Sequence, residues 1–378
     1  MKKITLFLSF LMLNFIIVAQ EGMIAEINKL LDEELDKDNV HNVFFSIYSP
    51  TKSIDLHSVK GSFSDGSLVS EANPFYTASI GKTFTATTLG ILVDRGKLHF
   101  DDPISKYLPD EIMDGLHILN GVDYKDSIRL SHLLQHTSGL PDYFNRETID
   151  GSTGIFDLIM TDKEHFWQPS ELIQFSKAHF RPNFAPGKGY LYTDTEYVLL
   201  GMIIEEVSKM PLHDFFAKEI FEPLSMNSTY LNLRSTGKNA LGKMAELYAG
   251  GYEISTFKSL SADWAGGAII STGKDLIRFQ IALFGTELVS EETLNKMQEW
   301  TYETVGMTYG YGLRKIKFSE LDPSFPNLEV IGHSGSNGTS MYYCPDEDIY
   351  LVGTLNQLES SKDAVILLAR VLEKCTNF

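Results

Sequence analysis

Short apolar runs near both ends of the chain predict β-strands. The run over 43–48 has the β-branched and aromatic content of a buried strand, and it ends at Ser49-Pro50. A second strand is expected over 53–59, after a short turn. Four C-terminal runs are equally short and are bounded by Gly, Pro or Asp: 310–316, 330–333, 339–343 and 350–354.

Longer segments with apolar residues three and four positions apart predict α-helices. The clearest of them covers 195–209 and stops before Pro211, which cannot continue a helix. A helix over 79–95 is closed by Gly96. The other segments with helical features are 23–35, 130–136, 169–178, 212–221 and 361–374.

The order of these elements predicts the fold class. Strands at both ends with helices between them indicate an α/β (α+β) fold, with a mainly antiparallel sheet built from both chain ends and flanked by helices. We expect one lobe from about 21–98 and 300–378, and an inserted, mostly helical lobe over about 99–299. No Pro/Ser-rich linker separates the lobes, so we expect one rigid unit with a binding cleft between them.

Residues 1–20 have the pattern of a secretory signal. Lys2 and Lys3 precede an apolar stretch over 4–18, and the small residue Ala19 precedes polar positions. The stretch is too short for a membrane-spanning helix, and no Cys is present for a lipid anchor. We therefore expect a mature chain over 21–378, exported to the periplasm or secreted, without a stable membrane anchor. A retained N-terminal anchor is the alternative.

Composition narrows the classes of partner. With 43% hydrophobic residues the chain can bury a large core, and its net charge of −18 repels nucleic acid phosphates. We expect a small-molecule or peptide substrate and no nucleic acid. The two cysteines, Cys344 and Cys375, lack a metal-binding spacing, and their pairing stays open, as does the oligomeric state.

The pair Ser79-x-x-Lys82 is the first candidate for chemistry. Residues three positions apart at the start of a helix lie on one face, so the Lys82 amine can reach the Ser79 hydroxyl. A serine beside a base is an activated nucleophile. The alternative is an exposed helix start capped by Ser79, and a single S-x-x-K tetrapeptide is expected by chance in a chain this long.

Two further segments are candidate partners of this pair. Tyr192-Thr193-Asp194 leads into the helix over 195–209, and a tyrosine beside a cation ionises more readily and accepts a proton. The alternative is that Asp194 caps the helix and Tyr192 packs. The segment 332–336 follows a predicted strand, where Gly335 permits close approach of a ligand and the Ser336 amide can contribute to an oxyanion hole. The alternative there is a simple turn.

Other motifs fail on their spacing. Gly81-Lys82-Thr83 resembles the end of a phosphate-binding loop, but Tyr76 stands where its first glycine belongs. His132 and His136 are four positions apart, but Leu133 replaces the glutamate that a zinc protease needs. The chain also has no G-x-S-x-G elbow. We therefore expect no bound metal.

Taken together, the three motifs resemble those of the serine β-lactamase and penicillin-binding family, in its class C-like branch of D-Ala-D-Ala carboxypeptidases, D-aminopeptidases and esterases. The resemblance covers roughly 25–375 and has secondary signatures elsewhere. These are Leu133-Leu134-Gln135-His136-Thr137-Ser138-Gly139-Leu140, Leu199-Leu200-Gly201, Pro223-Leu224-Ser225-Met226 and Ala265-Gly266-Gly267 before Ser271-Thr272.

The resemblance implies a role for each motif residue. Ser79 would attack a carbonyl and form an acyl-enzyme, Lys82 and Tyr192 would shuttle its proton, and the amides of Ser79 and Ser336 would hold the oxyanion. Residues that would contact the substrate are Asp194, His333, Ser334 and Gly335. The resemblance also implies that no organic cofactor is needed.

The chain departs from the family pattern at two positions. Asp194 stands where the family usually has Asn, and a carboxylate there would hold Lys82 cationic and leave Tyr192 as the main base. His333 replaces the lysine usual in the family's β-lactamases, and neutral imidazole suits a β-lactam carboxylate less well. We expect an exported serine hydrolase of peptidase, D-aminopeptidase or esterase type, with β-lactamase activity less favoured. The alternative is a non-catalytic sensor or binding protein.

Overall fold

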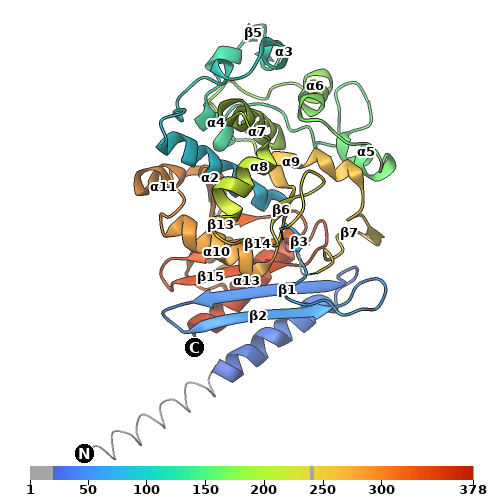
Figure 1. Ribbon diagram of the computed structural model, residues 1–378, viewed down its shortest axis with the longest axis vertical. Coiled ribbons are helices and arrows are strands. Elements are labelled where there is room, and N and C mark those ends of the chain that lie inside the picture. The colour runs from blue at the N-terminus through green and yellow to red at the C-terminus, as the bar shows by residue number, and fades with distance from the viewer. Residues whose placement is uncertain (1–19, 239–241, 378) are drawn as a thin grey trace, which may run out of the picture.

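An antiparallel sheet built from both ends of the chain organises the molecule, as a computed structural model that describes residues 20–238 and 242–377 shows. The strand order is β10-β11-β12-β13-β14-β15-β1-β2. Figure 1 shows the blue N-terminal strands beside the red C-terminal ones, with the teal and green middle of the chain at the other end of the molecule. The strands are β1 (Asn42–Ser49), β2 (Ile54–Gly61), β10 (Thr301–Thr304), β11 (Met307–Tyr309), β12 (Arg314–Lys317), β13 (Glu329–Ser334), β14 (Ser340–Cys344) and β15 (Ile349–Thr354).

Strand β1 is buried along nearly its whole length because both faces of the sheet are covered. Val43, Phe45 and Ile47 belong to one buried core, whereas Phe44 belongs to the other. The first core also contains residues of the N-terminal helix over 20–35 and of α13 (Ser361–Thr376). The second core is larger and joins the sheet to the helical middle of the chain.

The middle of the chain is mostly helical, with three small sheets. The short strands are β3 (Phe75–Tyr76), β4 (Ile118–Leu119), β5 (Val122–Asp123), β6 (Tyr230–Leu231), β7 (Tyr248–Ala249), β8 (Tyr252–Glu253) and β9 (Ile269–Ser271). Besides α13 and the N-terminal helix over 20–35, the α-helices of the described residues are α2 (Gly81–Asp94), α3 (Asp110–Met113), α4 (Leu130–Leu134), α5 (Ile155–Thr161), α6 (Pro169–His179), α7 (Asp194–Ser208), α8 (Leu212–Phe216), α9 (Trp264–Gly267), α10 (Gly273–Phe284), α11 (Glu291–Met297) and α12 (Phe318–Leu321).

The predicted fold class is confirmed: a large antiparallel sheet from both chain ends is flanked by helices. The strand predicted over 310–316 is wrong at its start, since β12 begins only at Arg314. Gly312 has a φ of +66°, and a Cβ atom on it would lie 2.4 Å from Cβ of Ala86. The chain thus turns against α2 before it enters the sheet.

The two cysteines are free thiols, and both are buried in the core that contains α13. Within 20–238 and 242–377, no helix is both long and apolar enough to cross a membrane. The signal sequence expected over 1–20 lies almost entirely outside the described residues.

Candidate active site

The nucleophile candidate Ser79 lies in a single turn of 3₁₀-helix, η1 (Ala78–Ile80), directly before α2. The continuous helix predicted from residue 79 therefore begins two residues later, at Gly81. Ala78 has a φ of +48°, in the left-handed region that residues with a side chain rarely adopt. Such strain is typical of residues that are held in place for function. The Lys82 ammonium nevertheless donates to the Ser79 hydroxyl at 3.2 Å, as the three-residue spacing predicts.

Lys82 is completely buried, and its charge is neutralised by Asp194. Its Nζ donates to the Asp194 carboxylate and, at 3.0 Å, to the backbone carbonyl of Gly266. Burial disfavours the charged form, but Asp194, followed by Tyr192 and Asp263, raises the pKa of Lys82 above its ordinary value. Lys82 is therefore a cation that donates hydrogen bonds to Ser79 and Asp194, and it has no lone pair with which to accept a proton.

Asp194 and Tyr192 lie at the start of α7, but Asp194 does not cap this helix. The N-cap is Thr193, whose hydroxyl accepts from the Thr195 amide at 3.1 Å. This cap leaves the Asp194 carboxylate free to bind Lys82. The capping alternative for Asp194 is therefore wrong, and the Tyr192 ring both packs against His136 and faces Lys82.

Tyr192 is held with its ring centroid 5.0 Å from Nζ of Lys82. We expected a neighbouring cation to lower the pKa of this phenol, and that expectation is wrong for the net effect. Burial raises the pKa of Tyr192 to about 12, because the lowering by Lys82 is smaller and Asp194 adds to the increase. Tyr192 is thus a neutral phenol near pH 7, with one proton to give and one oxygen to accept with.

His136, from the Leu133–Leu140 segment, packs against the ring of Tyr192. The two ring centroids are 4.3 Å apart, and the amide of Thr193 donates to His136 Nδ1 at 3.3 Å. The same nitrogen contacts the carboxyl of Glu196, whose pKa is raised well above its ordinary value, first by burial. The contacts of His136 Nδ1 with Glu196 and with the Thr193 amide together fix the loop that carries Tyr192.

The third motif ends strand β13 and packs against the nucleophile turn. A Cβ atom on Gly335 would lie 2.7 Å from the carbonyl oxygen of Thr77 and 2.8 Å from Cβ of Ala78, so only glycine allows this approach. Asn337 donates to the carbonyl of Tyr76 at 2.7 Å and locks the two segments together. Ser336 consequently lines the same cavity as Ser79.

His333 does not line this cavity, although we expected it to contact the substrate. Its side chain is completely buried, with Nε2 2.9 Å from the Tyr309 hydroxyl and Nδ1 2.8 Å from the carbonyl of Ser334. Burial, then Arg314 and Lys82, hold the pKa of His333 well below its ordinary value. His333 is therefore a neutral residue that positions the end of β13.

Arg314, on the neighbouring strand β12, was missed in the sequence. It donates to the Ser334 hydroxyl at 2.9 Å and forms a two-pronged ion pair with Glu303 of β10, at 2.7 and 2.6 Å. Its guanidinium lies 5.6 Å from the centroid of the Tyr192 ring. A permanent cation thus stands beside the third motif, but Glu303 balances its charge. Arg314 is close to the third motif because β12 pairs with β13, and the sequence does not show this pairing.

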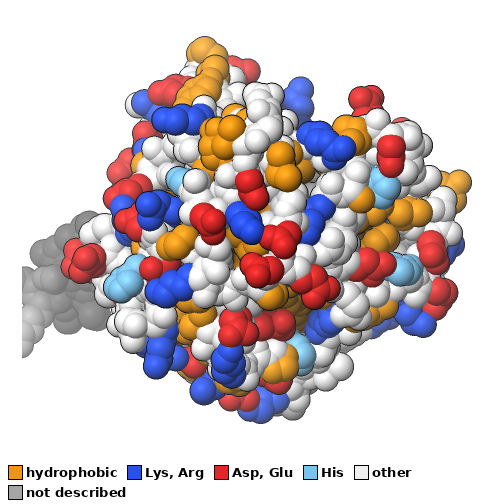
Figure 2. Space-filling view, turned by 90° about the horizontal axis from the view of Figure 1, so that it is seen from above, with side chains coloured by type: hydrophobic (Ala, Val, Ile, Leu, Met, Phe, Trp, Pro, Cys, Tyr) orange, Lys and Arg blue, Asp and Glu red, His pale blue; other side chains and the backbone are white. Residues whose placement is uncertain are grey.

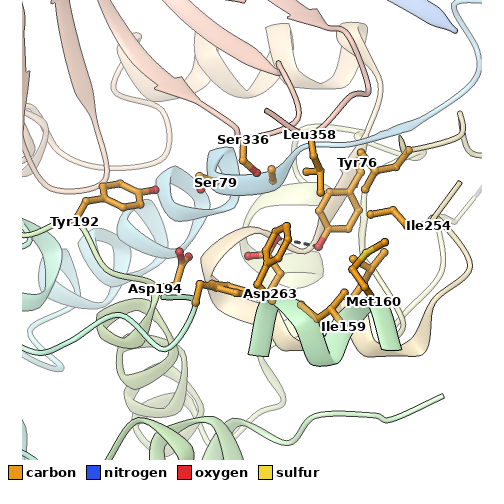
Figure 3. A pocket seen from close by; sticks show the side chains of 15 residues that line it. Tyr76, Ser79, Ile159, Met160, Tyr192, Asp194, Ile254, Asp263, Ser336 and Leu358 are labelled. Atoms are coloured by element: carbon orange, nitrogen blue, oxygen red, sulfur yellow. Dashed lines mark hydrogen bonds between the residues drawn. The ribbon is translucent and has the colours of Figure 1, made fainter. Parts of the chain in front are cut away.

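A cavity of about 260 Å³ opens beside Ser79. Figure 3 shows Ser79 and Ser336 on one side of it, with Asp194 and Asp263 facing them across the space. The remaining lining side chains are mainly apolar, and none of the lining residues is Lys, Arg or His. The apolar lining residues include Phe144, Phe156, Ile159, Met160, Leu247, Ile254, Leu260 and Leu358.

Asp263 is a second residue that the sequence did not indicate. Its carboxylate accepts from the Tyr76 hydroxyl at 2.9 Å, as the dashed line in Figure 3 shows. Burial, and then the negative charge of Asp194, raise the pKa of Asp263 to about 7. The only available signal was its place directly before the Trp264-Ala265-Gly266-Gly267 segment.

The glycines of that segment make room for both carboxylates. A Cβ atom on Gly266 would lie 2.6 Å from Oδ1 of Asp194, and one on Gly267 would lie 2.4 Å from Oδ2 of Asp263. A Cβ atom on Gly81 would also lie 2.8 Å from Cα of Gly267. The Ala265-Gly266-Gly267 signature is thus a steric requirement of the site, because any side chain there would displace a carboxylate or the start of α2.

The surface above the helical end of the molecule is mixed in charge. Figure 2, which views that end, shows acidic and basic side chains interspersed around orange apolar patches. The surface view is compatible with a site whose specificity resides in the cavity.

Comparison with known proteins supports the arrangement. A sequence model of the family described as Beta-lactamase matches residues 27–376. The chain is 28% identical to penicillin-binding protein 4* of Bacillus subtilis, over 69% of this chain and 55% of that protein. It is 26% identical to a putative D-alanyl-D-alanine carboxypeptidase of Escherichia coli K12, over 71% of this chain and 65% of that protein. The chain thus spans between about half and two thirds of the length of these curated relatives.

Among solved structures, a D-stereospecific amidohydrolase from a Streptomyces species superimposes with a TM-score of 0.74. The two chains are 26% identical, and the match covers 91% of this chain and 98% of that one. The similarity therefore extends over the sheet and the helical part alike.

Proposed function

The chain belongs to the β-lactamase family, and from that premise we propose that it is a serine hydrolase that cleaves amides through an acyl-enzyme on Ser79. One observation carries the proposal: a buried ammonium donates to the Ser79 hydroxyl at the mouth of an apolar cavity. The cavity has the size and lining to hold the apolar acyl part of a small substrate. Amide substrates are favoured by the names of the amidohydrolase and carboxypeptidase relatives.

The acylation step follows from the charge states of the residues. The Ser79 oxygen attacks the amide carbonyl and passes its proton to the Tyr192 oxygen, while Tyr192 gives its own proton to the leaving nitrogen. A phenol with a pKa near 12 relays a proton in this concerted way more readily than it releases one beforehand. The Lys82 ammonium stabilises the negative charge that develops on both oxygens.

The oxyanion of the tetrahedral intermediate would be held by the amides of Ser79 and Ser336, two residues that line the same cavity. The C–N bond then breaks, and the amine leaves with the proton from Tyr192. In deacylation a water molecule attacks the ester carbonyl, its proton passes through Tyr192 back to Ser79, and the acid is released. Every step is assigned to side chains and amides of this chain.

Activity toward β-lactams is the less favoured alternative within this family. Arg314 supplies near Ser334 the positive charge that His333 lacks, but Glu303 neutralises the charge of Arg314. The pair of Arg314 and Glu303 therefore gives the surroundings of Ser334 no net positive charge with which to attract a β-lactam carboxylate.

Covalent labelling tests the proposal. A fluorophosphonate probe should label the protein at Ser79, and Ser79→Ala should abolish the label. A panel of amino acid amides, p-nitrophenyl esters, nitrocefin and an acyl-D-Ala-D-Ala peptide then identifies the substrate class. A folded protein that is neither labelled nor active on this panel would instead favour the sensor or binding role.

We also propose that the protein is exported, to the periplasm or outside the cell. The support is the pattern of Lys2, Lys3 and the apolar stretch over 4–18. Cell fractionation followed by N-terminal sequencing should find a chain that starts near Gln20 or Glu21. A chain that retains Met1 in the cytoplasm would contradict export.

A further inference from the structure

The cavity beside Ser79 combines an apolar lining with more carboxyl groups than cationic side chains. Two carboxyl groups, those of Asp194 and Asp263, line it, and within residues 20–238 and 242–377 the ammonium paired with Asp194 is that of Lys82. Lys82 is already occupied by Asp194, the Gly266 carbonyl and Ser79. Among the described residues, Asp263 has no cationic side chain within salt-bridge distance, and its carboxylate has only the Tyr76 hydroxyl as a side-chain donor.

Such a carboxyl group is suited to receive a cation from outside the protein. Asp263 lines the cavity, and its Oδ2 atom accepts from Tyr76 and lies close to Gly267. A buried carboxyl without a partner cation favours its neutral form, and a bound ammonium reverses this preference because opposite charges attract strongly away from water. The attraction between the charged carboxylate and an ammonium therefore stabilises the complex only when a cationic group enters the cavity.

From this arrangement we propose that Asp263 is a specificity-determining residue that binds the protonated amino group of the substrate. The preferred substrates are then amides of apolar amino acids with a free amine, rather than N-acylated peptides. The inference rests on the proposed amide hydrolysis and deepens it. Figure 3 shows Ile159, Met160 and Ile254 near one another among the lining side chains, and the apolar side chain of the substrate would lie against them with its carbonyl at Ser79.

Three substrates separate the contribution of the amine from that of the apolar group. They are phenylalanine amide, tested as both enantiomers, N-acetylphenylalanine amide and 3-phenylpropionamide. Assays at pH 7 keep most of the free amine protonated, since an α-amino group has a pKa of about 7.7–8.0. The wild-type protein should prefer phenylalanine amide, in one enantiomer, by about tenfold or more in kcat/KM over 3-phenylpropionamide.

Asp263→Asn should abolish this preference. We expect kcat/KM for phenylalanine amide to fall by about 10- to 100-fold, and that for 3-phenylpropionamide to stay within about threefold. Asp263→Ser is the second neutral variant, should the first not fold. Tyr76→Phe is the matched control, because it removes the hydrogen bond to Asp263 and keeps the carboxylate; it should retain the preference. An equal loss on both substrates in the Asp263 variants would overturn the proposal.

A binding measurement separates this inference from the proposed hydrolysis. By calorimetry, Ser79→Ala should bind phenylalanine amide more tightly than 3-phenylpropionamide, and Ser79→Ala/Asp263→Asn should not. That result supports the amine site even if the wild-type protein cleaves no amide, in which case only the proposed hydrolysis fails. If Ser79→Ala shows no preference for the amine, the site is wrong even if amides are cleaved.

Discussion

Two buried ion pairs flank Tyr192, and they differ in their balance of charge. On the side of the sheet, Arg314 and Glu303 form a two-pronged pair with one charge of each sign. On the helical side, among the described residues, the ammonium of Lys82 lies near several carboxyl groups, which include those of Asp194, Asp142 and Asp263. The balanced pair holds the sheet and Ser334 in place, whereas the unbalanced group surrounds the reacting serine. Charge imbalance thus marks the side where chemistry and substrate recognition are expected.

Removal of the Lys82 charge should have the largest effect. Lys82→Met leaves Asp194 without its cation and Ser79 without its donor, so kcat/KM should fall by about 10³-fold or more. Steady-state kinetics on the best amide substrate measures the fall, and circular dichroism checks that the variant is folded. A folded Lys82→Met protein with a tenth of wild-type activity would contradict the assignment.

Removal of the Arg314 charge should act mainly on stability. Arg314→Met leaves the Glu303 carboxylate, whose side chain is only 13% exposed, without its partner cation. The free energy of unfolding should therefore fall by about 3 kcal/mol. Urea unfolding of the single variant and of Arg314→Met/Glu303→Leu provides the measurement. The double variant should recover most of the loss, since it leaves no unpaired buried charge. If both variants are equally destabilised, the loss of stability does not come from the unpaired charge of Glu303.

The surplus of carboxyl groups predicts a pH-dependent stability. Burial, and then Asp194, raise the pKa of Asp142 to about 7, above its ordinary value near 4. The folded state therefore binds this proton more tightly than the unfolded state, and stability is lost as the pH rises from about 4 through 7. Asp142→Asn should raise the free energy of unfolding by about 1–3 kcal/mol more at pH 8 than at pH 5. An equal effect at both pH values would show that Asp142 is not the titrating group.

The smallest effect is expected for the family's usual residue at position 194. Asp194→Asn removes the negative charge that keeps the pKa of Lys82 high, so burial should lower that pKa and the alkaline limb of the pH–rate profile should move down by about one unit or more. The profile of kcat/KM between pH 5 and 10 provides the measurement. An unchanged profile would mean that Asp194 does not set the charge of Lys82.

The sequence predicted the parts of the site that are local. Ser79 and Lys82 are three positions apart, so any helical turn brings them together. The strands near both termini were found from short apolar runs, because a sheet covered on both faces leaves that pattern. The start of β12 was misjudged, since close packing of Gly312 against α2 has no local signature.

The electrostatic character of the site was less accessible to sequence reasoning. Tyr192 was expected to ionise readily beside Lys82, but burial has the larger effect on its pKa. Arg314 and Asp263 were missed, because their neighbours at the site come from distant segments. A charged residue in a linear sequence gives no indication of how deeply it is buried or which charges surround it.

The sequence by itself therefore determined the fold class, through the periodicity of its apolar positions, and the family, through the resemblance of its three motifs to a known family. Only the tertiary structure decided that Lys82 is a paired cation, that His333 lies outside the cavity and that Asp263 faces the cavity without a cation. The physical reason is that charge states depend on desolvation and on distances between segments far apart in the chain.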